Sequence, residues 1–327
     1  METNKHKSTK VNAINYNADY HVVGKRLKSK SKIKLVLTTI IWSSIVGLVL
    51  WSIYIVFSYV SELSEPSLPP LNLNQTVAKS SPLVQLRYYV GSNENLAPKN
   101  LTDQFLTNYL DVRQNDVQKS YDSIQTYFRL RQDRPDLFMN ATEGASFVQP
   151  QIYYYQKEMT ANNESILYVK LANWKYETQN YAKAMATCVP FAEIKVINGA
   201  SQQPPPITIL DMSDWTFSHM ISASPSDLRL AHEVTERSFP VPTGKIHIVH
   251  QNWFAEQTFR LSRLLMSDDT TDNIFYHGDN LSELYKSVPK NILPTPVGGD
   301  VPLRIWTKQE LDKFDLILEK YRNQFLV

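Results

Sequence analysis

The sequence predicts an α/β protein in which a mixed β-sheet is layered with helices and preceded by a separate apolar helix. Three observations predict this architecture. Residues 35–60 contain no charged side chain, residues 101–138 carry apolar side chains at helical spacing, and from about residue 165 strand-like and helix-like segments alternate. Such alternation is typical of a sheet covered by helices.

The composition is that of a folded protein. Apolar residues make up 43% of the 327 residues and charged residues 20%, which argues against global disorder. The formal net charge is +2, and no dense basic stripe follows residue 60, which argues against nucleic-acid binding. Cys188 is the only cysteine, so an intrachain disulfide and a cysteine metal cluster are excluded.

Residues 35–60 predict a single membrane-spanning helix. Their 26 residues exceed the roughly 20 that cross a bilayer core, whereas a buried core helix is usually shorter and a signal peptide has an apolar region of about 7–15 residues. The tail of residues 1–34 is basic, and Glu62 and Glu65 follow the apolar run. Because basic flanks stay inside, we expect a cytoplasmic N-terminus and an exoplasmic or lumenal domain.

The sidedness has an alternative in a domain that faces the cytosol. Five N-x-S/T sequons follow the apolar run, at positions compatible with lumenal exposure. Chance gives roughly three such matches at this content of Asn, Ser and Thr, so the sequons do not determine on which side of the membrane the domain lies.

Two segments precede the predicted sheet. Residues 61–98 are rich in Ser, Pro and Asn and predict an extended tether. Residues 99–145 predict a helical subdomain, because apolar side chains recur at threes and fours around Phe105 and Tyr109 and again from Val117 to Phe128. A break at 113–116 separates the two helices of this expected antiparallel pair.

The sheet region follows. Ser224 and Pro225 provide an N-cap and a proline at the first helical position for one of its helices. The expected strands cover residues 165–173, 204–212, 244–252 and 273–278, and the expected helices cover residues 183–200, 224–239 and 253–266.

Together these segments resemble the CRAL-TRIO lipid-transfer domains, especially the branch that carries tocopherol and retinaldehyde. The resemblance covers residues 100–300 approximately, through segments such as ITILDMSDWTFSHM, SFPVPTGKIHIVHQNWF and IFYHG, with LYKSVPKNILPTPVGGD at the end. It implies a lipid-binding domain at residues 146–300 and leaves a C-terminal helix at residues 301–327. It also implies that the last strand forms the sheet edge and that Gly298 and Gly299, with positive φ, help lead the chain back over the sheet.

The resemblance further implies an apolar pocket on the sheet, closed by a movable lid helix that begins at Asn252. The expected function is that of a membrane-anchored protein that binds and transfers a retinoid, a tocopherol or a phospholipid-like molecule without catalysis. The expected pocket and lid residues are Ile207, Ile209, Phe217, Val234, Phe239, Val241, Ile246, Ile248, Trp253, Phe254, Phe259, Leu264 and Leu265.

Two charged segments are relevant to the binding of a lipid head group. Where relatives place basic residues for phosphoinositides, this chain has only Lys245 after SFP and the acidic turn SDDTTDN after the lid. Carboxylates repel phosphate, so phosphoinositide-triggered release is doubtful. Arg260 and Arg263 on the lid are candidates for head-group contact, with a solvated helix face as the alternative.

The sequence contains no motif that is typical of an enzymatic or metal site. The chain lacks H-E-x-x-H, G-x-S-x-G and Walker patterns, so no catalytic residue, metal or cofactor is expected. We interpret three histidines as residues of the fold: His219, His232 and His247.

The alternative to a carrier is an interaction module that keeps the fold, fills the pocket with its own side chains and binds a protein partner.

Overall fold

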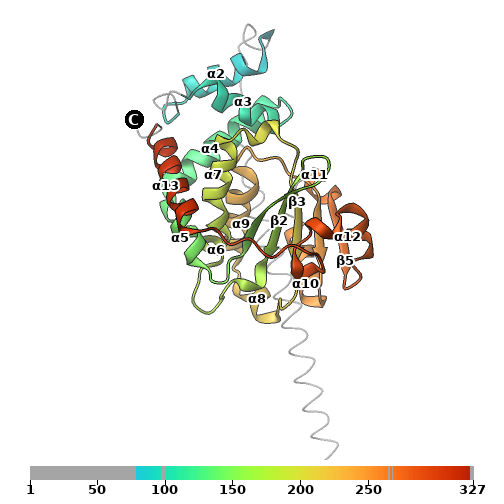
Figure 1. The fold of residues 1–327 in the computed structure, drawn as a ribbon. Helices are drawn as coiled ribbons and strands as arrows, with labels where there is room; N and C mark the ends of the chain where they lie inside the picture. The colour runs from blue at the N-terminus through green and yellow to red at the C-terminus, as the bar shows by residue number, and fades with distance from the viewer. Residues whose placement is uncertain (1–78, 97–100, 264–265, 267, 325–327) are drawn as a thin grey trace, which may run out of the picture. The chain divides into compact units, whose positions relative to one another are not determined.

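The computed structural model describes residues 79–96, 101–263, 266 and 268–324, within the compact unit Ser61–Val327. These residues form a five-stranded sheet in the spatial order β1-β2-β3-β4-β5 (Figure 1). The strands are β1 (Tyr153–Met159), β2 (Ser165–Lys170), β3 (Ile207–Asp211), β4 (Ile246–Val249) and β5 (Ile274–Gly278). The helices are α2 (Pro82–Ser92), α3 (Asp103–Val112), α4 (Val117–Asp133), α5 (Ala141–Phe147), α6 (Tyr181–Met185), α7 (Val189–Ile197), α8 (Phe217–Ser222), α9 (Pro225–His232), α10 (Trp253–Ser262), α11 (Asp268–Asp272), α12 (Ser282–Ser287) and α13 (Lys308–Asn323).

The sheet is mixed, as the sequence predicts. β1 pairs with β2 in antiparallel orientation, and β2 to β5 run parallel. The four predicted strands contain β2 to β5. These segments form strands because their β-branched and aromatic side chains suit a half-buried pleated surface. β1 was not among them, since its sequence YYYQKEM mixes aromatic and charged residues.

The register fixes which side chains share a face. One row across the parallel strands contains Tyr168, Ile209, His247 and Phe275, and the next row contains Val169, Leu210, Ile248 and Tyr276. Because successive residues of a strand point to opposite faces, these two rows lie on opposite sides of the sheet.

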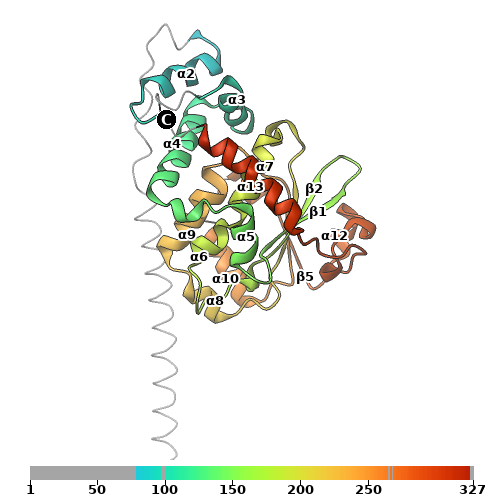
Figure 2. The same cartoon turned by 60° about the vertical axis from the view of Figure 1, so that its left-hand side comes forward.

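Different segments cover the two faces. Residues 281–297, which include α12, pack on the face of Ile209 through Leu284, Val288 and Leu293. The face of Ile248 belongs to a second core cluster, to which α6, α9 and α10 contribute. Figure 2 shows α12 on one side of the sheet and α6, α9 and α10 on the other.

The segment after β5 follows the predicted course. β5 is the sheet edge, α12 follows, and the chain returns over the sheet as expected. Gly298 has φ +72°, and a Cβ there would lie 2.6 Å from the Tyr285 hydroxyl. Gly299 is needed for a different reason than predicted, because a Cβ there would lie 2.1 Å from the Leu293 carbonyl oxygen.

The N-terminal helices form a third cluster around Leu106, Ile124 and Tyr127. Asp116 caps α4 by accepting a hydrogen bond from the Lys119 amide, and the predicted break lies between α3 and α4. The structure also places a helix, α2, inside the segment expected to be a tether. Pro82 at its first turn, followed by Leu86 and Val90 at a spacing of four, explains why this part folds and packs.

The predicted localisation requires a correction. No helix in the described part of the chain combines the length and apolar character needed to cross a bilayer. The two longest there, α4 with 17 residues and α13 with 16, fall short of the roughly 20 required and carry many charged side chains. The run 35–60 and the tail 1–34, on which the topology rested, lie outside the described residues. We therefore do not retain the single-pass membrane topology or the exoplasmic placement.

Candidate functional site

The two faces of the central strand β3 are buried to different extents. Ile209 is 0% exposed and Ile207 is buried beside it, whereas Thr208 and Leu210 on the other face remain partly exposed. A central strand that helices cover on both faces is normally buried on both. The coverage on the α10 side is therefore incomplete over Thr208 and Leu210, although Ile248, the neighbour of Leu210 on that face, is 0% exposed.

We give the name α10 compartment to the residues on this face of the sheet together with the α9 and α10 side chains that pack with them. Its sides include Phe254 and Phe259 of α10 and Leu228 of α9, which belong to the same core cluster. Its floor consists of the partly exposed residues Leu167, Thr208, Leu210, Ile246 and Ile274, all on one face of the sheet.

The structure divides the four predicted pocket isoleucines between the two faces. Ile246 and Ile248 lie on the side of the α10 compartment. Ile207 and Ile209 point away from it, into the core beneath residues 281–297. The segment ITIL carries apolar or β-branched residues at both parities, so its sequence alone does not say which set faces the helices.

The other predicted site residues also lie in several different parts of the fold. Phe254 and Phe259 face the compartment, whereas Val234, Phe239 and Val241 pack with the N-terminal helices. Phe217 and Trp253 are exposed, as are Lys245, Arg260 and Arg263. Leu264 and Leu265 lie outside the described residues.

Sequence reasoning missed four floor residues, Leu167, Thr208, Leu210 and Ile274. Each lies in a predicted strand. The sequence therefore predicted the strands but not which of their side chains lie on the sheet face of the α10 compartment. The signal that identifies them is registration with Ile246, which the prediction already included: Thr208 and Ile274 are its direct partners on β3 and β5.

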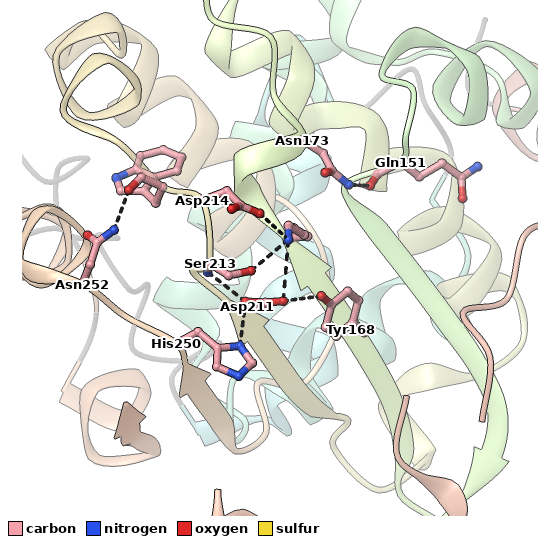
Figure 3. Close-up of polar contacts among 10 residues, drawn as sticks. Gln151, Tyr168, Asn173, Asp211, Ser213, Asp214, His250 and Asn252 are labelled. Carbon is pink, nitrogen blue, oxygen red and sulfur yellow. Dashed lines mark hydrogen bonds and ion pairs between the residues drawn. The ribbon is translucent and has the colours of Figure 1, made fainter. Parts of the chain in front are cut away.

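The N-terminal half of α10 is fastened to the loop after β3. Asn252 donates a 2.7 Å hydrogen bond to the Trp215 carbonyl oxygen (Figure 3). It also accepts a 3.0 Å hydrogen bond from the Ala255 amide. The Trp215 indole N–H donates to the Thr258 hydroxyl at 3.1 Å. These contacts hold the first turns of α10, which we call its fixed end.

A buried carboxylate organises the end of β3. Asp211 accepts hydrogen bonds from the Tyr168 phenol at 2.5 Å and the Ser213 amide at 2.8 Å. It also contacts His250 Nδ1 at 3.1 Å and Lys170 Nζ at 4.0 Å (Figure 3). Burial by itself would raise the pKa of Asp211, but the hydrogen bonds it accepts outweigh burial, so the pKa is lowered. The carboxylate thus stays ionised and joins β2, β3 and the loop after β4.

Exposed apolar side chains gather where α8 meets α10. Phe217 and Ile221 of α8 are exposed, and Trp253 at the start of α10 is 63% exposed. The Phe217 ring centroid lies 5.8 Å from that of Phe254, and Trp253 lies 5.3 Å from Phe254. We call Phe217, Ile221 and Trp253 the aromatic patch.

Two other types of site receive no support. A cavity of about 270 Å³ lies between α3, the end of α7 and α13, lined in part by Phe105, Asn108 and Tyr321, and it shares no residue with the α10 compartment. Its volume falls below the roughly 300–1,000 Å³ usual for ligand sites. In the part of the chain that the structure describes, no three His, Cys, Asp or Glu side chains are placed to hold a metal ion.

Comparison with known proteins supports the resemblance found in the sequence. Residues 149–299 match the family model of the CRAL/TRIO domain. Clavesin-1 of Rattus norvegicus is 25% identical over 236 residues, which cover 71% of this chain and 66% of clavesin-1. Clavesin-2 of Homo sapiens is 27% identical over 217 residues, 64% of this chain and 66% of clavesin-2. The chain thus matches slightly less than two thirds of the length of these relatives.

Among solved structures, the crystal structure of Sfh5 matches with a TM-score of 0.49 and 13% sequence identity. The match covers 82% of this chain and 92% of that chain.

Proposed function

We infer from the match of residues 149–299 to the family model of the CRAL/TRIO domain that this protein binds a hydrophobic small molecule and transfers it between environments. The observation that carries this proposal is the partly exposed floor of the α10 compartment, where Thr208 and Leu210 of the central strand are less buried than Ile207 and Ile209 on the opposite face. We propose that the ligand is a retinoid, a tocopherol or a phospholipid-like molecule that lies on this floor beneath α10.

The driving force is the removal of apolar surface from water. Each Å² of apolar surface buried contributes about 25 cal/mol, so a lipid chain of several hundred Å² provides many kcal/mol before the costs of ordering. Leu210 and Ile246 lie at the centre of the floor, and Phe254 and Phe259 would cover the ligand. No nucleophile takes part in this binding.

Transfer requires contact with the membrane that supplies or receives the ligand. The aromatic patch supports such contact, because tryptophan and phenylalanine side chains partition into the bilayer interface. It lies at the fixed end of α10, so a docked protein would keep its compartment beside the bilayer. Lys245, Arg260 and Arg263 are exposed and are our candidates for contact with lipid head groups.

Native mass spectrometry and fluorescence transfer test the proposal directly. The full-length protein is incubated separately with α-tocopherol, all-trans-retinaldehyde and phosphatidylcholine vesicles, and bound lipid is then measured. We expect stoichiometric uptake of at least one of the three. Uptake of none would favour the alternative, an interaction module whose own side chains fill the compartment.

A matched pair of variants locates the site. Leu210→Trp fills the floor and should lower uptake by about tenfold or more, since a bulky side chain displaces ligand surface. Leu316→Trp makes the same change at an exposed position on α13 and should leave uptake unchanged. Thermal unfolding of both variants checks the fold. Equal uptake by Leu210→Trp and the parent would place the ligand elsewhere.

A further inference from the structure

Two histidines from neighbouring strands contact each other on the sheet face opposite the α10 compartment. His247 of β4 is 2% exposed, and its Nδ1 lies 2.9 Å from Nε2 of His277 on β5. The two rings are stacked, with centroids 5.1 Å apart and planes inclined by 19°. The Phe275 ring also stacks with His247, at a centroid distance of 5.2 Å.

This contact depends on the protonation of both rings. A hydrogen bond between two ring nitrogens needs one nitrogen with a proton and one without. When both rings are protonated, both facing nitrogens carry hydrogen and two positive charges lie side by side. Moreover, among the described residues no group hydrogen-bonds Nε2 of His247, although this atom is buried. A proton added there would place a charge in the core without a partner, which is costly.

The surrounding charges do not stabilise the doubly protonated form of the His247–His277 pair. Lys245, which directly precedes β4, opposes a positive charge on His247, and the direct neighbour of His247 on β3 is the uncharged Ile209. Glu283 on α12 favours a charge on His277, but its carboxylate is also paired with Lys286 at 2.6 Å. Burial, together with His277 and Lys245, lowers the pKa of His247 to about 4, and burial lowers the pKa of His277.

Opening of β5 would relieve this penalty. In an opened form the two imidazoles are hydrated and titrate near the ordinary value of about 6.5. The opened form therefore binds more protons than the closed form between about pH 6.5 and pH 4, and acidification across this window favours opening. β5 is well suited to separate, since in the described sheet it is an edge strand that pairs with β4 alone.

β5 also contributes to the α10 compartment. Ile274 is part of the floor, and the Tyr276 ring lies 6.3 Å from Phe259 of α10. We propose that the His247–His277 pair is an acid-sensitive latch that holds β5 closed at neutral pH and releases it, and with it the bound hydrophobic molecule, as the pH falls. The release of ligand rests on the proposed function, whereas the opening of β5 does not.

Amide hydrogen exchange tests the latch without any ligand. Exchange of β5 amides in the full-length protein, corrected for the intrinsic effect of pH, should be about tenfold or more faster at about pH 5 than at about pH 7.5, because linkage favours the opened form. In the His247→Phe/His277→Phe variant, which keeps stacked rings but cannot take up protons, this acceleration should vanish. His232→Gln, which removes a histidine on α9, should leave it unchanged.

Titration of the imidazole resonances of the parent protein provides a second readout if the double variant does not fold. We expect the His247 and His277 signals to keep their neutral shifts until β5 opens. A β5 exchange rate that is independent of pH, or histidine signals that titrate while β5 stays protected, would overturn the latch.

Ligand release is measured separately from opening. Protein loaded with α-tocopherol, all-trans-retinaldehyde or phosphatidylcholine is mixed with acceptor vesicles of phosphatidylcholine at both pH values. We expect release about tenfold faster at the lower pH in the parent and not in the double variant. Loading followed by pH-independent release would overturn the release step and leave the proposed function standing. Failure to load any of the three overturns the proposed function and the release step, while β5 exchange still decides the latch.

Discussion

His250 Nδ1 lies 3.1 Å from the buried Asp211 carboxylate and so joins the loop before α10 to the end of β3. His250 adopts a left-handed conformation with φ +53°, which is uncommon for a residue with a side chain. The Asp211 contact therefore helps to hold a strained turn from which α10 begins three residues later. It connects the polar cluster on one face of the sheet with the helix that covers the other.

Asp211→Ala should destabilise the protein by roughly 2–3 kcal/mol, because it leaves the buried Tyr168 phenol without its acceptor and removes a charged partner of the turn. Urea unfolding measures this change. Asp214→Ala is the matched control, since Asp214 contacts the same Lys170 from an exposed position and should cost less than about 1 kcal/mol. Equal costs for the two variants would show that Asp211 does not organise the cluster.

Thr258→Val should loosen the attachment of α10. It removes the hydroxyl that accepts the hydrogen bond of the Trp215 indole and leaves that donor without a partner, at a cost of about 1 kcal/mol. Amides in the first turns of α10 should then exchange roughly fivefold faster, as local opening becomes easier. Thr258→Ser retains the hydroxyl and should behave like the parent. Equal exchange in the two variants would contradict the attachment.

Trp253→Ala and Phe217→Ala should weaken association with phosphatidylcholine vesicles, each by several-fold, because each removes apolar surface from the aromatic patch. Trp253 is 63% exposed, so its substitution should change stability by less than about 0.5 kcal/mol, whereas Phe217 is 36% exposed and packs on Phe254, so its substitution should cost roughly 1–2 kcal/mol. Ile305→Ala is the control, because it removes an exposed apolar side chain outside the patch. Vesicle flotation compares the three, and an equal effect of Ile305→Ala would exclude a specific membrane-facing patch.

Arg322→Met should cost roughly 3–5 kcal/mol of folding free energy, because it leaves the buried Glu193 carboxylate without its cation. Arg322 donates to Glu193 from Nε at 2.8 Å and to the Phe138 carbonyl from Nη1 at 2.9 Å, so it ties α13 to two segments. Lys308→Met breaks an exposed pair with Asp312 on the same helix and should cost less than about 0.5 kcal/mol. Thermal unfolding distinguishes them.

Global stability should decline as the pH falls from about 6.5 to about 4. His247 has a pKa near 4 in the folded protein and about 6.5 when unfolded, so in this window the unfolded state binds the additional proton. Its contribution, roughly 1–3 kcal/mol, is fully present above pH 6.5 and lost as the pH approaches 4. Urea unfolding across this range should give a flatter profile for His247→Phe/His277→Phe. Identical profiles would exclude His247 as the source.

The sequence predicted the type of most elements, although not β1 or α2. Periodicity identified the helix pair of α3 and α4 with its break, and β-branched runs identified β2 to β5, because helix and strand spacing depend on local backbone geometry. The resemblance to CRAL-TRIO domains added the order of the segments and the course of the chain after β5. The match of residues 149–299 supports that interpretation.

The tertiary structure decided which residues meet. Consecutive side chains of β3 point to opposite faces, and both parities are largely apolar, so only registration with β2 and β4 places Leu210 in the compartment and Ile209 outside it. The same registration brings His247 beside His277, thirty residues later, and Asp211 beside Tyr168 and His250. Such contacts join residues that are distant along the chain, and no local pattern of side chains encodes them.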